Sequence, residues 1–401
     1  MAADAEAIVA AIGRAVGPTE RPLHLHEPRF AGHEWTYVKE CLDTGWVSSA
    51  GRFVDQFEVE LARTCGARFA IAIVNGTAAL HVALRLVGVG PGDEVIVPAL
   101  TFVATANAVT YCGAIPQFVD SDPATLGLDP EKLQARLQRI ALRRDGALIN
   151  KETGRPIRAV VPVHVFGHPV DMDALGAVCA QFGVAVVEDA TESLGSTYHG
   201  RPCASLGRAG VLSFNGNKIV TTGGGGAIVT NDEELAHRAK HLTTTAKQPH
   251  PWAFLHDEIG WNYRLPNINA ALGLAQLEQL GSFVAAKRVV AQRYAEAFAG
   301  VPGVRWMKEP EGSSSNYWLN AILLDDDDMK TRDRVLQACH DAGFLARPAW
   351  TLMHRLTMFK NSPRDDLANA ESIERRLINL PSSAVLGLSD HLRQAALAEQ
   401  R

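Results

Sequence analysis

The chain has 401 residues, of which 47% are hydrophobic and 21% are charged, a composition typical of a globular protein of about two domains. Its formal net charge is −5, and no lysine- or arginine-rich run is present to bind phosphate backbones or anionic lipid, so nucleic-acid and membrane partners are disfavoured. No apolar run approaches the roughly 20 residues that cross a bilayer, and the N-terminus carries acids where a signal peptide carries bases. These features predict a cytoplasmic protein.

Residues 1–28 are predicted to form an N-terminal helical extension, because the first 17 residues have an amphipathic helical pattern. From about residue 55 to 232, apolar β-branched runs alternate with helical patterns, which is typical of parallel strands joined by crossover helices. The predicted strands are 70–74, 94–98, 115–120, 157–163, 184–189, 209–214 and 226–230. The predicted helices between them are 77–89, 104–113, 130–144 and 171–183. Nearly continuous apolar strands predict an α/β sheet covered on both faces.

The remaining segments complete the expected organisation. Residues 145–157 are polar and rich in turn formers, which indicates a surface hairpin or loop. After residue 265 the pattern changes to two helices, 267–280 and about 282–299, followed by short strands at 303–307 and 317–324. We therefore expect a large domain over 29–265 and a smaller C-terminal α+β domain over 266–401.

Neither the cysteines nor the acidic run at 325–328 indicates a metal site. Cysteines occur at positions 41, 65, 112, 179, 203 and 339, without a CxxC pair, so we expect reduced residues in the core. The four aspartates at 325–328 precede a helical pattern, where acidic residues suit a helix N-terminus.

Two strand ends carry candidate binding residues. Asp189 ends a buried strand at the carboxyl edge of the sheet, where open α/β sheets bind ligands, although it could also cap a turn or helix. The strand 70–74 runs directly into Asn75, Gly76 and Thr77 and then into a helix, so free N–H groups of the first turn could bind a phosphate. Such junctions are common, and this one alone does not establish phosphate binding.

Lys218 lies in the segment SFNGNKIVTTGGGG, residues 213–226, which lacks the amphipathic face on which a surface lysine would sit. A partly desolvated lysine amine is a nucleophile that forms a Schiff base with an aldehyde cofactor. The alternative is a lysine that extends from a loop to solvent. Gly223 to Gly226 lead directly into a strand, and glycine there lets the chain turn tightly around a close neighbour.

One cofactor accounts for all three signals. Pyridoxal phosphate needs a lysine for its aldehyde, an anion site for its phosphate and a carboxylate that keeps its ring nitrogen protonated. Lys218, the pair Gly76 and Thr77, and Asp189 supply one of each.

The sequence also resembles the sugar-nucleotide aminotransferases of the DegT type over nearly its whole length. The resemblance rests on residues 44–58, 75–84, 93–109, 161–172, 187–196 and 260–277 together with the lysine segment. It implies a fold-type I pyridoxal-phosphate transferase, with a large, mostly parallel seven-stranded sheet domain and a smaller C-terminal α+β domain.

The resemblance also implies roles for individual residues. Lys218 would be the Schiff-base lysine and Asp189 the partner of the pyridinium nitrogen. Glu192 would face the ring hydroxyl, a position where many relatives carry glutamine or histidine. Phe102 corresponds to the aromatic residue that stacks on the cofactor ring.

Further residues are implied around the phosphate and the cavity. Ser213 would join Gly76 and Thr77 on the phosphate, and Asn262 matches a residue contributed by the neighbouring subunit, which implies a homodimer with shared active sites. His164 ends a strand and is expected to line the same cavity, with a hydrogen-bonded core histidine as the alternative.

The lysine segment departs from the common family pattern. Most relatives have Pro-Thr-Lys or Pro-Ser-Lys, whereas this chain has Asn215, Gly216 and Asn217 before Lys218. This looks like the branch that aminates UDP-2-acetamido-4-keto-6-deoxyhexoses, and residues 26–58 look most like the legionaminic-acid type. Related 3-dehydratases have histidine in place of the lysine, so Lys218 favours transamination.

The implied reaction transfers an amino group from L-glutamate to C4 of a UDP-2-acetamido-4-keto-2,6-dideoxyhexose, releases 2-oxoglutarate and follows ping-pong kinetics. Its UDP-4-amino sugar would serve surface-glycan or nonulosonic-acid biosynthesis. The candidate nucleotide-binding residues are Arg264, Arg347, Trp350 and His354, although Trp350 could instead pack in the small domain.

Two other functions remain open from the sequence. One is a GDP-4-keto-6-deoxymannose aminotransferase of the perosamine type, which would share the cofactor residues and differ in the nucleotide pocket. The other is a regulatory protein that binds the cofactor without turnover, against which the complete set of cofactor residues argues.

Overall fold

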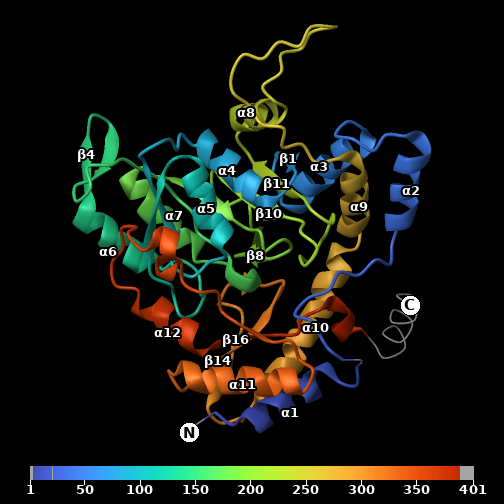
Figure 1. The fold of residues 1–401 in the computed structure, drawn as a ribbon, viewed down its shortest axis with the longest axis vertical. Helices are drawn as coiled ribbons and strands as arrows, with labels where there is room; N and C mark the ends of the chain where they lie inside the picture. The colour runs from blue at the N-terminus through green and yellow to red at the C-terminus, as the bar shows by residue number, and fades with distance from the viewer. Residues whose placement is uncertain (1–2, 20, 389–401) are drawn as a thin grey trace.

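The computed structural model describes residues 3–19 and 21–388, and its main feature is a seven-stranded sheet (Figure 1). The strand order is β1-β11-β10-β7-β6-β2-β3. The strands are β1 (Phe69–Ile73), β2 (Glu94–Pro98), β3 (Ile115–Val119), β6 (Ile157–Val160), β7 (Ala185–Asp189), β10 (Ala209–Ser213) and β11 (Gly226–Thr230). Every predicted strand of the large domain is therefore present, with ends shifted by at most three residues.

Most of the sheet is parallel, but one strand is not. β11 pairs antiparallel with both β1 and β10, whereas the β10, β7, β6, β2 and β3 pairs are parallel. No helix was predicted between the strands 209–214 and 226–230, and the connection from β10 to β11 is the lysine segment, which contains no helix. A connection without a helix allows the chain to return antiparallel to the strand it left, as it does here, although β7 and β10 pair in parallel across a connection that also has no helix.

Helices cover both faces of the sheet, as predicted. Alternate strand residues point to opposite faces: Ile71 and Val211 pack under α4 (Gly76–Leu86), α5 (Val103–Tyr111) and α8 (Glu233–Thr243). On the other face, Ala72 and Leu212 pack against α3 (Arg52–Thr64) and α9 (Asn267–Leu277), and Ile96 packs against α6 (Pro130–Ile140) and α7 (Met172–Phe182).

The predicted helix 130–144 ends early, at Ile140. The following residues form a hairpin of β4 (Ala141–Arg144) and β5 (Ala147–Asn150), which projects from the body in Figure 1. Its two turn residues, Asp145 and Gly146, both have positive φ, at 50° and 78°. An Asp-Gly pair in this conformation makes the two-residue hairpin turn, so the chain leaves the helix to pair with itself.

The C-terminal elements form a second layer around a four-stranded sheet of order β12-β14-β16-β15. Its strands are β12 (Val304–Trp306), β14 (Asn320–Leu324), β15 (Arg347–Pro348) and β16 (Leu377–Leu380), covered by α10 (Leu280–Phe298), α11 (Met329–Asp341) and α12 (Ala368–Arg376). Asp328 caps α11 by accepting hydrogen bonds from the N–H groups of Lys330 and Thr331, which confirms the capping role expected for the acidic run.

Two helices pack on a different layer from the one that their place in the chain suggests. α1 (Ala5–Val16) packs against α10 and α11 at the end of the molecule opposite α8 (Figure 1). α9, which the predicted boundary at residue 265 assigns to the small domain, packs instead on α3 and on α2 (Glu34–Thr44). The short strands β8 (Thr197–Tyr198), β9 (Arg201–Pro202) and β13 (Ser313–Ser314) form a separate small sheet.

All six cysteines are free and buried, as predicted. Among the described residues, none of the helices has the length and apolar character of a membrane span.

Candidate active site

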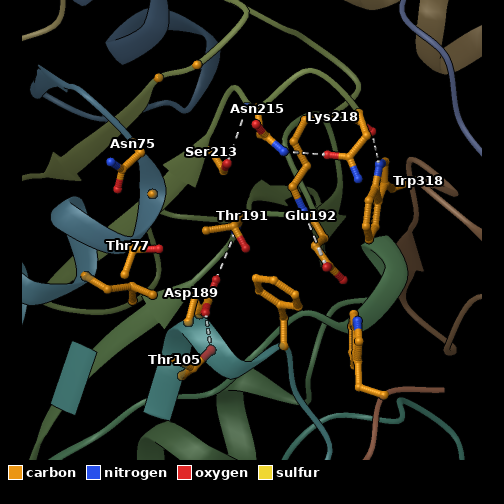
Figure 2. A pocket seen from close by; sticks show the side chains of 18 residues that line it. Asn75, Thr77, Thr105, Asp189, Thr191, Glu192, Ser213, Asn215, Lys218 and Trp318 are labelled. Atoms are coloured by element: carbon orange, nitrogen blue, oxygen red, sulfur yellow. Dashed lines mark hydrogen bonds and ion pairs between the residues drawn. The ribbon is translucent and has the colours of Figure 1, made fainter. Parts of the chain in front are cut away.

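A cavity of about 310 Å³ opens at the carboxyl edge of the large sheet. Its walls come from the start of α4, the start of α5, the turn after β7 and the loop after β10, which are the positions where open α/β sheets bind ligands. The predicted site residues that line it are Gly76, Thr77, Phe102, Asp189, Glu192, Ser213, Lys218 and Trp350. Residues as far apart in the chain as Thr77 and Trp318 therefore face one cavity (Figure 2).

Lys218 reaches into this cavity from the loop after β10, with only 12% of its side chain exposed. Its Nζ lies 3.4 Å from Glu192 Oε1 and 3.8 Å from the centroid of the Trp318 ring (Figure 2). The indole is fixed by its own hydrogen bond, in which Trp318 Nε1 donates to the carbonyl of Asn217 at 2.8 Å. A carboxyl group and an aromatic face therefore stabilise the half-buried amine and hold it in place.

The glycines after Lys218 allow two chain segments to approach closely. A Cβ at Gly226 would lie 2.5 Å from the main-chain carbon of Asn75, so a side chain there would displace the start of α4. Gly223 has φ of 77°, a conformation that other residues adopt only with strain. The glycine run thus serves to pack the lysine loop against the first turn of α4.

Asp189 lies at the end of β7 and is only 3% exposed. Its Oδ2 accepts a hydrogen bond from Thr105 Oγ1 at 2.7 Å, and its Oδ1 accepts one from the N–H of Thr191 at 3.2 Å (Figure 2). The second bond is the turn bond of the capping alternative, but each oxygen retains a free lone pair. Asp189 can therefore accept a hydrogen bond from a protonated ring nitrogen in the cavity.

The start of α4 offers an anion site. Asn75 caps the helix, and the N–H groups of Gly76 and Thr77 have no carbonyl one turn earlier to accept them. A Cβ at Gly76 would lie only 3.0 Å from the Cβ of Ser213, so the end of β10 is pressed against this helix start. Backbone N–H groups, two hydroxyls and the positive end of the helix dipole converge there, which suits a phosphate.

Glu192 has an unusual charge environment. Burial raises the pKa of its carboxyl group to about 7, with a smaller upward contribution from Asp189, while Lys218 and the N–H of Phe166 act in the opposite direction. The Phe166 N–H donates to Glu192 Oε2 at 2.8 Å. The carboxyl group can therefore gain or lose a proton near neutral pH, next to the amine of Lys218.

Replacing Glu192 with glutamine is expected to change how the stability of the cofactor-free protein depends on pH. Because the pKa of Glu192 rises from its ordinary 4.5 to about 7 on folding, the folded state binds the extra proton between these values. The free energy of unfolding therefore falls as pH rises through this range, by up to about 3 kcal/mol, and Glu192→Gln should remove that part of the fall. Urea unfolding at pH 5, 6 and 7 measures the free energy of unfolding of wild type, of Glu192→Gln and of the control Glu311→Gln, which changes an exposed side chain. If this free energy changed with pH by the same amount in all three proteins, the prediction would be contradicted.

Not every predicted residue lies at the cavity. His164 is fully buried and does not line it: its Nε2 lies 3.1 Å from Glu188 Oε2, and its Nδ1 accepts the N–H of Val170 at 3.1 Å. It is the hydrogen-bonded core histidine of the alternative interpretation. Both ring nitrogens are satisfied by the chain itself, which leaves none for a ligand.

The four candidate nucleotide-binding residues do not all lie at this cavity. Trp350 lines the cavity, and Arg347 lines an adjoining one. His354 lies outside both, where its Nε2 is 3.2 Å from Glu371 Oε1. Arg264 is exposed and donates to Asn262 Oδ1 at 3.1 Å, away from the cavity of its own chain.

The cavity residues that sequence reasoning did not single out include Thr105, Thr191 and Trp318. Thr191 lies two residues after Asp189 and Thr105 three residues after Phe102, both of which were singled out, so their places in the cavity could have been considered. Trp318 gave no such signal, because it belongs to the C-terminal part of the chain and reaches Lys218 only through the packing of the two layers.

Comparison with known proteins identifies similar chains. The model of the DegT/DnrJ/EryC1/StrS aminotransferase family matches residues 29–393. The GDP-perosamine synthase of Caulobacter vibrioides is 41% identical over 94% of this chain and 98% of its own, and that of Vibrio cholerae is 34% identical over 90% and 94%. The putative pyridoxal phosphate-dependent aminotransferase EpsN of Bacillus subtilis is 38% identical over 91% and 92%.

A solved structure agrees with these sequence relatives. The aminotransferase TlmJ from Streptoalloteichus hindustanus superposes with a TM-score of 0.82 and 30% identity, covering 94% of this chain and 98% of its own. The similarity thus extends over both sheets.

Proposed function

Because the chain belongs to the DegT/DnrJ/EryC1/StrS aminotransferase family and is a pyridoxal-phosphate-dependent sugar-nucleotide aminotransferase, we propose that it aminates C4 of GDP-4-keto-6-deoxymannose with L-glutamate as donor. The observation that carries the choice of sugar is the 41% identity, over nearly both full chains, to a protein named GDP-perosamine synthase. This favours the perosamine-type alternative over the UDP-acetamido sugar that the Asn-Gly-Asn-Lys segment suggested.

The cavity residues fit the cofactor. Gly76, Thr77 and Ser213 would hold its phosphate, Asp189 its ring nitrogen and Phe102, which is 54% exposed and at the cavity wall, one face of its ring. When bound, pyridoxal phosphate supplies an aldehyde that links to amines and a ring that accepts an electron pair from the adjacent carbon. The buried carboxylate of Asp189 would keep the ring nitrogen protonated for that purpose.

Lys218 would carry the proton transfers. Its Nζ would take the proton from Cα of glutamate in the first half of the reaction and deliver one to C4 of the sugar in the second. Glu192 and Trp318 position this amine, at 3.4 Å and 3.8 Å. The face of the sugar that is presented to Nζ then determines the configuration at C4.

A homodimer is part of the proposal, with Asn262 of one subunit reaching the phosphate of the other. Asn262 and Arg264 are exposed and outside the cavity of their own chain, which supports a role toward a partner. The segment that precedes them projects beyond α8 (Figure 1), and its side chains Trp252, Phe254 and Ile259 are exposed. Large apolar side chains on a projecting arm are typical of an association surface.

The proposed substrate is tested by offering the cofactor-loaded enzyme L-glutamate with either GDP-4-keto-6-deoxymannose or UDP-2-acetamido-4-keto-2,6-dideoxyglucose. We expect a GDP-linked amino sugar by mass spectrometry, with kcat/KM at least about 10-fold higher than for the UDP substrate, because the nucleotide pocket discriminates by a few hydrogen bonds. Lys218→Ala is the negative control. Higher kcat/KM with the UDP substrate would reverse the assignment, and no product with either would reject both sugars.

A further inference from the structure

Lys287 is a fully buried lysine that the proposed reaction does not use. It lies on α10, which begins in the core of the large domain and continues into that of the small one. Burial lowers the pKa of its amine well below the usual value, and within the described part of the chain no carboxylate forms an ion pair with it. Burying an amine is costly unless its N–H groups are hydrogen-bonded, so the acceptors of this amine indicate its role.

The amine of Lys287 holds two chain segments at the ends of paired strands. Its Nζ donates to the carbonyl of Trp318 at 3.2 Å and to the carbonyl of Ser382. Trp318 precedes β14 and Ser382 follows β16, and these two strands pair. Ser382 Oγ also accepts the N–H of Asn320 at 2.8 Å. Lys287 therefore fixes the main chain of Trp318 relative to α10 and to β16.

Trp318 is in turn tied to both groups beside the catalytic amine. Its ring lies 3.8 Å from Lys218 Nζ, and its Nε1 donates to the carbonyl of Asn217 at 2.8 Å (Figure 2). Its main-chain N–H donates to Asn316 Oδ1 at 2.7 Å, and Asn316 Nδ2 donates to the carbonyl of Glu192 at 2.9 Å. A shift of the Trp318 main chain would therefore move the ring off the amine and loosen the turn that carries Glu192.

We propose that Lys287 is a positioning residue for Lys218, which acts by fixing the main chain of Trp318; this rests on the proposed role of Lys218 in the reaction. Lys287 does not line the cavity, so it acts through Trp318 and not on the substrate. An apolar side chain of similar volume would fill the space but would leave the two carbonyls without this donor. The ring would then restrict Lys218 Nζ less, and a misplacement of about 1 Å can lower a rate about 100-fold.

The first test uses the cofactor-free protein, where limiting acetic anhydride labels free amines and peptide mass spectrometry gives the rate at each lysine. Lys287→Met removes the donors at similar volume. We expect the labelling rate of Lys218 to rise about 3- to 10-fold, because the ring covers Nζ for less of the time, while that of exposed Lys360 stays within about 2-fold. Lys287→Gln keeps two N–H donors on a shorter side chain and should show a smaller rise, of about 2-fold.

A double-mutant cycle tests whether Lys287 acts through Trp318. In Trp318→Leu the ring is absent, so labelling of Lys218 should already be raised, and adding Lys287→Met should change it by less than about 2-fold. Val290→Ala is the matched control, because Val290 lies three residues further along α10 and is also buried. It should lower the free energy of unfolding without changing the labelling of Lys218. The same rise in Val290→Ala, or a full further rise in the double variant, would overturn the proposal.

The second test uses the cofactor-loaded enzyme. In Lys287→Met the rate of the glutamate half-reaction at saturating glutamate should fall about 10-fold, with the apparent Kd for glutamate within about 2-fold of wild type, because the amine is misplaced and the binding groups are not. An unchanged rate, or unchanged labelling of Lys218, would overturn the proposal. If Lys287→Met does not fold, Lys287→Gln decides the result through the same labelling.

Failure of the proposed function is seen separately. Neither test contains a sugar, so a wild-type enzyme that makes no amino sugar from either nucleotide sugar would reject the substrate and leave the result for Lys287 standing.

Discussion

Replacing Lys218 with alanine is expected to lower the rate of the glutamate half-reaction by at least about 10³-fold, the largest effect of any single substitution. The loss would follow because this amine is the proposed covalent anchor of the cofactor, and no other lysine among the described residues lines the cavity. Single-turnover absorbance with L-glutamate measures the rate. Borohydride reduction followed by peptide mass spectrometry should place the cofactor on Lys218 in wild type and on no residue in the variant.

Exposed Lys360→Ala is the matched control and should retain both the rate and the cofactor adduct. A cofactor adduct at another lysine after borohydride reduction would contradict the prediction. Lys287 is the fully buried lysine to examine, although its Nζ donates to the carbonyl of Trp318 at 3.2 Å and Lys287 does not line the cavity. An adduct there, with the rate preserved, would remove Lys218 from the mechanism.

Asp189→Asn is expected to have the second largest effect, a loss of about 10²- to 10⁴-fold in the rate of the glutamate half-reaction. An amide cannot stabilise the positive charge on the ring nitrogen, and removing one partner of a buried charged pair costs about 3–5 kcal/mol. The substitution keeps the shape of the side chain and a hydrogen-bond partner for Thr105. Stopped-flow absorbance gives the rate, and thermal unfolding of the cofactor-free variant tests whether the fold is intact.

Thr105→Val provides a graded comparison. It removes the hydroxyl that donates to Asp189 Oδ2 at 2.7 Å but leaves the carboxylate in place. We expect a loss of about 5- to 20-fold, since one hydrogen bond to a charged group contributes about 1.5–3 kcal/mol and water can replace part of it. If Thr105→Val lowered the rate as much as Asp189→Asn, Asp189 would act through its position and not through its charge.

Local chemistry made part of this site predictable. Each of Gly76, Asp189 and Ser213 stands at a strand end, and the carboxyl ends of neighbouring parallel strands meet at one edge of a sheet, so their convergence follows from the strand assignment. Lys218 was recognisable because its segment consists largely of small residues and lacks the amphipathic face on which a surface lysine would sit. His164 shows the limit of this reasoning: it too follows a strand, but it turns inward, where its Nε2 lies 3.1 Å from the buried carboxylate of Glu188.

The sequence by itself determined the seven strands, their helical cover and the residue types of the cofactor cavity, because hydrophobic periodicity and turn chemistry act between neighbours along the chain. The tertiary structure alone decided the antiparallel direction of β11 and the position of Trp318 against Lys218. The contact of Trp318 with Lys218 joins residues 100 positions apart, and packing of the two layers brings them together. No pattern within a local window of the sequence records which side chains meet across such an interface.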